Sequence, residues 1–198
     1  MLHLSGDPQA DQLLSEDPYA LLIGMVLDQQ VPLERAFSSP RDLKERLGGK
    51  LDVAEIASMD PAKLAAVFSE RPALHRFPAS NAERVQQLSR IIVQDYDRDA
   101  ARIWEGATTG AELLRRVKAL PGFGEQKAKI FVALLGKQLG VRPSGWQEVS
   151  RPYGDAGTTF SVADITDAGS LIRVRAFKSQ AKAAAKAAKA GDGTQVEQ

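Results

Sequence analysis

Apolar residues recur at helical spacing along most of this chain, and glycine or proline interrupts the pattern between segments. Residues 20–27 are almost entirely hydrophobic, which predicts a helix buried on most of its sides. Pro32 cannot continue that helix comfortably, so it is expected to end within Asp28-Gln29-Gln30-Val31. Further helices are predicted near residues 41–47, 53–57, 62–69, 82–96 and 109–119. With no convincing strand pattern and no internal repeat, the predicted fold class is all-α.

Residues 113–135 predict two amphipathic helices joined by the turn Leu120-Pro121-Gly122-Phe123-Gly124. Glycine accepts a positive φ without a Cβ penalty, so this sequence lets the backbone reverse. The turn leaves the first N–H groups of the second helix unpaired at its positive end, which suits a phosphate. Lys127 and Lys129 add charge in the next turn. The pattern predicts an anion site made of backbone, with an ordinary glycine-rich turn as the alternative.

Three serines mark further helix boundaries. Ser80-x-x-Glu83 and Ser144-x-x-Gln147 have the spacing of a capping box, and the first is expected to open the long helix at residues 82–96. Residues 161–165 are expected either as an extended piece or as the cap of a final helix. The Lys/Ala tract at residues 181–190 has no apolar face, so we expect it to be frayed or disordered without a polyanion.

Composition and charge narrow the class of protein. The 198 residues carry a net charge of +1, but residues 120–190 hold eleven lysines and arginines against five acidic residues. Segregated positive charge favours a polyanion partner, and a solvated lysine-rich tail is the alternative. The chain has no cysteine, which excludes disulfides, thiolate zinc fingers and iron–sulfur clusters. No signal peptide or membrane span is visible, so a cytoplasmic protein is expected.

The order of these segments resembles a known family. An apolar helix ending in Leu27-Asp28-Gln29-Gln30-Val31, then several short helices, then the 120–124 turn and a long apolar helix, is similar to the helix-hairpin-helix DNA glycosylases, the superfamily of endonuclease III. The resemblance covers roughly residues 19–152. It implies a two-lobed helical fold with DNA and a base pocket between the lobes. We expect residues 19–105 to form one lobe, 1–18 plus 106–178 the other, and 179–198 a flexible tail.

The resemblance also implies which residues contact DNA. In the family the hairpin holds the DNA backbone through glycine N–H groups, and an amide at the end of the apolar helix fills the gap left by a flipped base. Gln30 matches that amide, and capping of neighbouring backbone is the alternative. Trp146 is expected at the pocket edge, where it would stack on the extruded base, with core packing as an equal alternative. The expected DNA-contact residues are Gln29, Gln30, Gly122, Phe123, Gly124, Gln126, Lys127 and Lys129.

The chemistry departs from the family pattern. Cleaving members carry an aspartate about 20 residues after the hairpin, and the corresponding segment 142–148 has none. Two carboxylates remain as catalytic candidates, Glu148 at about the expected distance and Asp28 beside the amides, with ordinary surface roles as the alternative for both. Members that also cleave the backbone use a lysine near the position of Gln126, so a Schiff-base mechanism is not expected. We expect no cofactor and no metal.

The function predicted from the sequence is base-excision repair. The chain is expected to be a monofunctional glycosylase that is monomeric and associated with the nucleoid. It is expected to bind double-stranded DNA through the phosphate backbone and a flipped base, and no membrane partner is expected. The alternative is a non-catalytic DNA-binding or damage-sensing protein. A helical adaptor for other proteins would leave the hairpin lysines unexplained.

Overall fold

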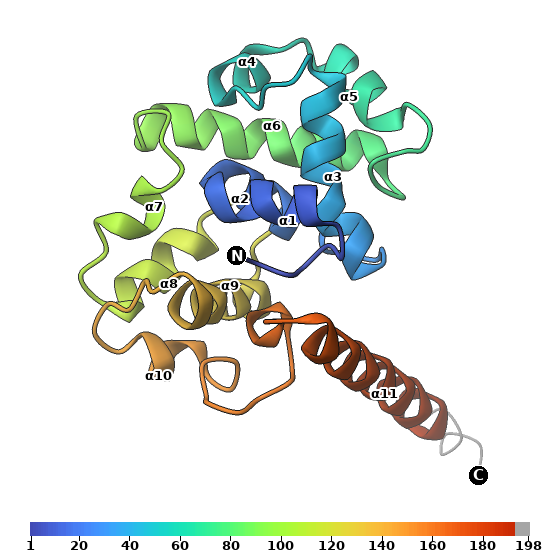
Figure 1. Cartoon of the computed structure of the whole chain (residues 1–198), viewed down its shortest axis with the longest axis vertical. Coiled ribbons are helices and arrows are strands. Elements are labelled where there is room, and N and C mark those ends of the chain that lie inside the picture. Colours follow the sequence, from blue (N-terminus) through green and yellow to red (C-terminus); the bar gives the residue numbers. More distant parts are fainter. Residues whose placement is uncertain (193–198) are drawn as a thin grey trace.

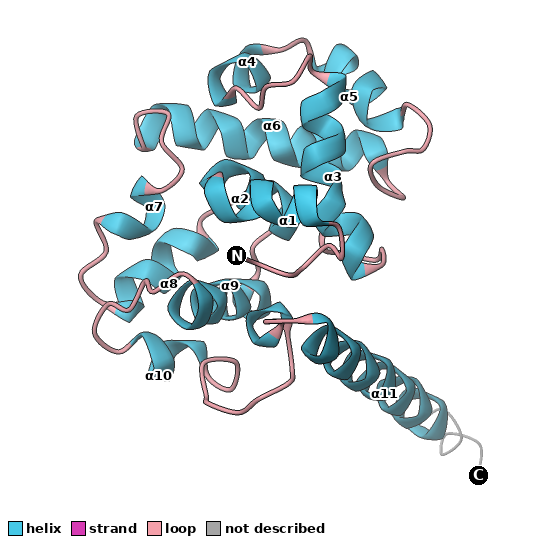
Figure 2. Ribbon diagram, in the orientation of Figure 1, coloured by secondary structure: helices cyan, strands magenta, loops and turns pink. Residues whose placement is uncertain are grey.

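The computed structural model describes the backbone of residues 1–192, and the side chains of this range except those of residues 182 and 185–192. Within residues 1–192 the chain is helical and contains no β-strand (Figures 1 and 2), which confirms the all-α fold class. The helices are α1 (Pro8–Glu16), α2 (Pro18–Leu27), α3 (Leu33–Arg46), α4 (Val53–Ser58), α5 (Pro61–Ser69), α6 (Pro78–Asp95), α7 (Arg102–Glu105), α8 (Gly110–Lys118), α9 (Glu125–Gln138), α10 (Trp146–Ser150), the 3-10 helix η1 (Val162–Asp164) and α11 (Ala168–Asp192).

Helix α2 lies at the centre of the molecule and every residue from Tyr19 to Leu27 is buried. It starts where the Asp17 carboxylate accepts hydrogen bonds from the first free N–H groups, and Pro18 supplies a preset φ. Gly24 allows a close approach to α3, since a Cβ there would lie 2.8 Å from a ring carbon of Phe37. The all-round hydrophobicity of residues 20–27 therefore corresponds to burial on all sides, as the sequence predicts.

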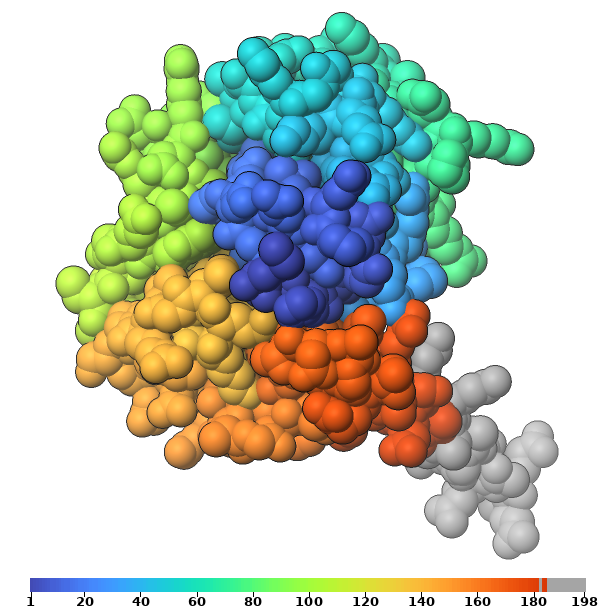
Figure 3. All heavy atoms as spheres, viewed as in Figure 1, coloured from blue at the N-terminus to red at the C-terminus, as the bar shows by residue number. Residues whose placement is uncertain are grey.

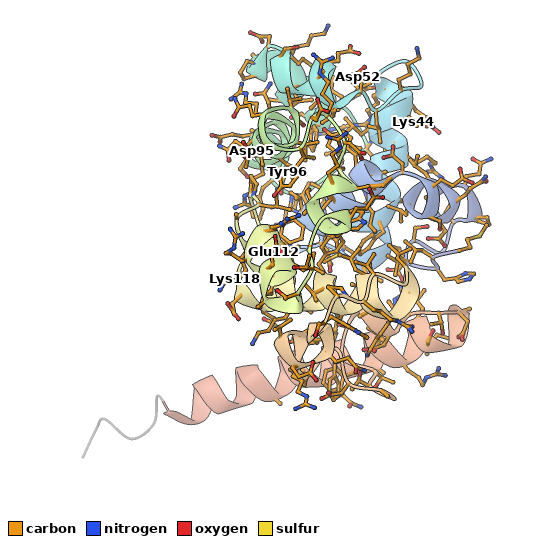
Figure 4. The ribbon with its side chains drawn as sticks, turned by 90° about the vertical axis from the view of Figure 1, so that its left-hand side faces the viewer. Lys44, Asp52, Asp95, Tyr96, Glu112 and Lys118 are labelled. Atoms are coloured by element: carbon orange, nitrogen blue, oxygen red, sulfur yellow. The ribbon has the colours of Figure 1, made fainter. Side chains whose placement is uncertain are left out.

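The remaining helices form two groups on either side of α2 (Figure 1). Helices α3 to α6 pack above it, with α4 and α5 both lying on the long helix α6. Asp52 caps α4 by accepting from two backbone N–H groups, and Figure 4 shows it at the end of the molecule farthest from α11. Below α2, helices α8, α9, α10 and η1 pack against one another, and α11 contacts η1. One continuous apolar core joins both groups.

The first helix packs on α2 and α3. Its arm is held there by Asp11, whose Oδ1 accepts hydrogen bonds from the N–H groups of Leu4 and Ser5 at 2.9 and 2.8 Å. The space-filling view shows this N-terminal segment lying over the junction of the two groups (Figure 3). That residues 1–18 form one lobe with the segment after residue 106 stays a prediction, as do the other boundaries of the two lobes.

Three helix boundaries differ from those expected, each for a local reason. The helix expected at 41–47 begins at Leu33 and runs through Pro40, because α3 buries one face that includes Pro40 and this packing outweighs one lost backbone hydrogen bond. Helix α6 begins at Pro78, whose ring favours the first helical position, so Ser80 lies inside the helix and caps nothing. At α10 the cap is Gly145, with a φ of 77°, and Ser144 makes no capping box.

The segments after residue 160 form one short 3-10 helix and one long α-helix. Ser161 and Asp164 form a capping box, but the helix they cap is the 3-10 helix η1, and α11 begins separately at residue 168. Helix α11 continues through the Lys/Ala tract to Asp192. That the tract frays without a polyanion stays a prediction. Residues 193–198 lie outside the described part of the chain. No helix in the described part is long and apolar enough to cross a membrane.

A close contact between α9 and α10 gives a stability prediction. A Cβ on Gly136 would lie 2.3 Å from two carbons of the Trp146 ring, so this glycine is required by packing. We expect Gly136→Ala to lower the free energy of unfolding by about 1–3 kcal/mol in urea denaturation, although alanine has the better helix propensity. In a Trp146→Ala background the same change should be neutral or stabilising. An equal loss in both backgrounds would show that the ring is not responsible.

Candidate nucleic-acid interface and base pocket

A cavity with a volume of about 740 Å³ opens where the end of α2 faces the start of α9. It brings together residues that lie almost 100 positions apart in the sequence, from the 28–30 segment and from the start of α9. It also receives Lys178 of α11. The lining residues are Met25, Asp28, Gln29, Gln30, Val31, Pro32, Arg76, Gln126, Lys127, Ile130 and Lys178.

Lys127 joins the two walls of this cavity. Its Nζ donates hydrogen bonds to the carbonyl oxygens of Met25 at 2.8 Å and Val26 at 3.3 Å, in the last turn of α2. An ammonium group there meets carbonyls that lack a helical partner, at the negative end of the helix. Burial lowers the pKa of Lys127 to about 8, and the nearby charge of Asp28 opposes that shift. The charge expected to meet a phosphate is therefore turned into the cavity.

Asp28 is the only acidic residue among the described residues that line the cavity. It ends α2, and its side chain is 17% exposed. Lys178 approaches it from α11, with its Nζ 3.6 Å from Asp28 Oδ2. The carboxylate is thus held between the lysines of α9 and α11, where it remains accessible from the cavity.

The two glutamines after Asp28 have different environments. The Gln29 side-chain oxygen accepts a hydrogen bond from Arg84 at 2.9 Å, and its backbone oxygen contacts His75 Nε2 at 2.8 Å. Gln30 is exposed, and its side chain has no hydrogen bond to any described residue. Its φ is 59°, a left-handed conformation that costs a non-glycine residue roughly 1–2 kcal/mol. Of the two side-chain amides, that of Gln30 is the one without a hydrogen-bond partner among the described residues.

His75 fixes the loop that carries these glutamines. Its Nδ1 accepts hydrogen bonds from the Phe77 N–H at 3.0 Å and from Asn81 Nδ2 at 2.8 Å. Because Nδ1 accepts, the ring proton must be on Nε2, which donates it to the Gln29 carbonyl. The ring is 4% exposed, and burial lowers the pKa of His75. The structure thus holds a neutral histidine behind the loop.

The hairpin presents its backbone rather than its side chains. Gly122 has a φ of 80°, and Gly124 caps α9 with no side chain bonded to the first N–H groups. Phe123 is 3% exposed and packs edge-on against Phe131, with 5.6 Å between the ring centroids. Only the backbone of Phe123 is left for a contact with DNA. Gln126 is exposed and donates to the hydroxyl of Tyr153 at 2.9 Å.

A glutamate balances the charge beside the hairpin. Glu125 pairs with Lys118 at the end of α8, which Figure 4 labels, and with Lys129 at 3.3 Å. Hydrogen bonds from these two lysines lower the pKa of Glu125. The positive charge expected from Lys129 is therefore shared with a carboxylate. A phosphate at this site would depend on the unpaired N–H groups of α9.

The two expected site residues on α10 do not reach the cavity. Trp146 and Glu148 lie on α10, and neither lines it. The Trp146 ring packs against Gly136 of α9, which is the core-packing alternative considered from the sequence. Of the two candidate carboxylates, only Asp28 lines the cavity.

The structure adds residues that the sequence did not single out. Phe77 is 46% exposed, unusual for a phenylalanine, and its ring lies 5.3 Å from the Arg76 guanidinium carbon. Arg84 contacts the Gln29 side chain, and its Cδ lies 4.0 Å from where a Cβ on Gly122 would be. The Arg84 contacts join segments distant in sequence, and no local motif marks them.

The comparisons with known proteins identify the family. A family model described as the HhH-GPD superfamily base excision DNA repair protein matches residues 23–191, and the chain belongs to this superfamily. The protein is therefore a base-excision DNA repair protein that binds DNA. Neither curated proteins nor solved structures gave a match. The resemblance inferred from the hairpin and the upstream glutamines is confirmed.

The buried ammonium of Lys127 predicts a pH dependence of stability. Its folded pKa of about 8 lies below the ordinary lysine pKa of 10.5, so the unfolded chain binds the proton more tightly. Relative to Lys127→Met, the wild type should therefore gain stability as pH rises from about 8 towards 10.5, by at most about 3 kcal/mol. Urea denaturation across that range measures the difference. Lys129→Met, at the surface of the same helix, controls for the loss of a lysine, and a pH-independent difference would contradict the prediction.

Proposed function

We propose that this base-excision repair protein is a monofunctional DNA glycosylase that extrudes a damaged or mismatched base into the cavity between α2 and α9. The observation that carries the proposal is the joint placement of Asp28 inside that cavity and Gln30 at its rim. An accessible carboxylate supplies negative charge where a sugar cation would develop. A free amide beside it supplies donors and acceptors for the base left behind.

The DNA grip in this proposal uses backbone and aromatic contacts. The N–H groups at the start of α9 would bind a phosphate, and Arg76 and Lys178, which line the cavity, would meet neighbouring phosphates. The exposed Phe77 ring, next to Arg76, offers a face on which a base can stack. This arrangement supports binding that is independent of sequence and sensitive to distortion of the duplex.

The chemistry in this proposal is hydrolysis of the N-glycosidic bond. The bond electrons leave with the base, water adds to the sugar carbon, and the proton that the water loses neutralises the departing base. As the bond breaks, charge develops on the sugar, and the Asp28 carboxylate stabilises it electrostatically. Gln126 has no amine at the position where backbone-cleaving members carry lysine, so no covalent imine is proposed at that position. Lys127 and Lys178 place positive charge beside the Asp28 carboxylate.

A second candidate is a damage-binding protein without glycosylase activity. Two observations favour it: Glu148 lies outside the cavity, and Asp28 is within 3.6 Å of Lys178, which weakens its free charge. Both candidates require base extrusion, so they differ only in whether a free base is released.

Release of free bases tests the catalytic role of Asp28. Duplexes that each carry one member of a mixed lesion panel are incubated with the protein, and released bases are identified by mass. We expect Asp28→Asn to reduce single-turnover release by about a hundredfold or more, because one well-placed electrostatic group contributes at least that much. Glu148→Gln, a matched change outside the cavity, should behave as the wild type. Undiminished release by Asp28→Asn would overturn its assignment, and no release from any lesion would favour the second candidate.

Binding to an abasic analogue tests base extrusion separately. The wild type should bind a duplex with a tetrahydrofuran abasic site more tightly than the intact duplex, and Gln30→Ala should remove the difference. Gln30→Gly should remove it too while relieving the left-handed strain, so a loss of preference without a loss of stability isolates the amide. Gln87→Ala, at an exposed glutamine of α6, is the control. Equal affinity of the wild type for both duplexes would disprove base extrusion.

A further inference from the structure

We propose that His75 is a positioning residue for Gln30, and that the protein distinguishes gapped from intact duplexes only while the His75 ring is neutral. This inference rests on the proposed function, because it concerns the amide that enters the gap. His75 touches no substrate in this scheme and acts through the backbone of Gln29.

The left-handed conformation of Gln30 requires neighbouring contacts that stabilise it. A non-glycine residue with a φ of 59° persists only where neighbouring contacts determine its conformation. The preceding residue supplies them. The Gln29 N–H donates to the Leu27 carbonyl at 2.7 Å, its side chain is held by Arg84, and its carbonyl is held by His75 at 2.8 Å. Of these groups, only the buried imidazole changes its charge near neutral pH.

The hydrogen bonds at Nδ1, on the other side of the His75 ring, explain why the ring must be neutral. Nδ1 accepts two N–H donors, one from the Phe77 backbone and one from Asn81. Protonation would place a third hydrogen against both of them. Asn81 cannot turn to receive it without losing its own bond to the Phe77 carbonyl at 2.9 Å. A charged ring must therefore leave its site, and the Gln29 carbonyl loses its donor.

The charged groups around His75 all favour the neutral ring. Arg84 of α6 and Lys127 of α9 act on it by charge, and both oppose a further positive charge. From α3, Arg35 reaches the same loop and donates to the carbonyls of Pro72 and Ala73, while its own charge is paired with Asp42. Arg76 is the neighbour on the loop itself. No acidic side chain pairs with the ring among the described residues.

Two substitutions separate the two faces of the ring. His75→Gln places an amide N–H near the position of Nε2, so it keeps a donor for the Gln29 carbonyl and cannot titrate near neutral pH. His75→Asn places an amide oxygen near Nδ1, so it keeps an acceptor for Phe77 and Asn81 and has no donor that reaches Gln29. The second histidine, His3, is present in both variants and serves as an internal control.

The experiment measures one ratio, the Kd for the intact duplex divided by the Kd for the same duplex with a tetrahydrofuran site, from about pH 8 to about pH 5 at fixed ionic strength. General electrostatic effects of pH change both affinities and cancel in the ratio. For the wild type we expect a constant ratio above about pH 7 and a fall of about three- to tenfold below about pH 6. His75→Gln should keep the ratio and lose its pH dependence. His75→Asn should show the low ratio at every pH.

The outcomes separate the two proposals. A wild-type ratio of one at every pH would end the base-extrusion proposal, and the role of His75 with it. A high ratio that is unchanged by pH and is the same in His75→Asn would overturn the role of His75 alone and leave base extrusion standing. If His75→Asn unfolds, which thermal denaturation would show, the comparison of wild type with His75→Gln still decides. A pH dependence that persists in His75→Gln would overturn the inference.

Discussion

The hydrogen bonds from Lys127 to the last carbonyls of α2 are the interaction on which the site depends. Helix α2 is buried on all sides, so its C-terminal carbonyls have few partners available within the core. The Lys127 ammonium provides one from the opposite wall of the cavity. This contact fixes where α2 stops relative to the hairpin helix α9. It therefore also fixes the position of the segment Asp28-Gln29-Gln30, which directly follows α2.

The same contact redistributes charge around the hairpin. Lys127 faces inward and Lys129 shares Glu125 with Lys118, so the turn carries little unpaired positive side-chain charge of its own. Backbone N–H groups at the start of α9 are then the main anion-binding element, which is the property expected from the glycine-rich sequence. Further positive charge lies on α11, which brings Lys178 to the cavity. In the proposed complex, the N–H groups of α9 bind the DNA backbone and the positive charge of α11 attracts the DNA, so two different helices serve these two purposes.

The sequence predicted those features that depend on local patterns. The burial of α2, the hairpin and the family follow from hydrophobic periodicity and from one glycine-rich turn. The placement of Glu148 and Trp146 could not be inferred, because it depends on how closely α10 approaches Gly110 and Gly136 of its neighbours. Segment 142–148 has the right spacing from the hairpin, but the packing of the Trp146 ring directs α10 away from the cavity. His75 and Arg84 were missed for a related reason, since their contacts with Gln29 span about 50 residues.

The conformation of Gln30 connects stability with recognition. Glycine would adopt this left-handed turn without strain, and the chain uses glycine at Gly122, where the hairpin needs the same region of φ. At position 30 it keeps a strained glutamine instead and holds the preceding residue by three separate hydrogen bonds. The difference between the two positions is the side chain: in the proposed complex Gly122 contacts DNA through its backbone, and Gln30 contacts it through its amide. Strain retained together with a free amide is consistent with a side chain that is selected for what it binds outside the protein.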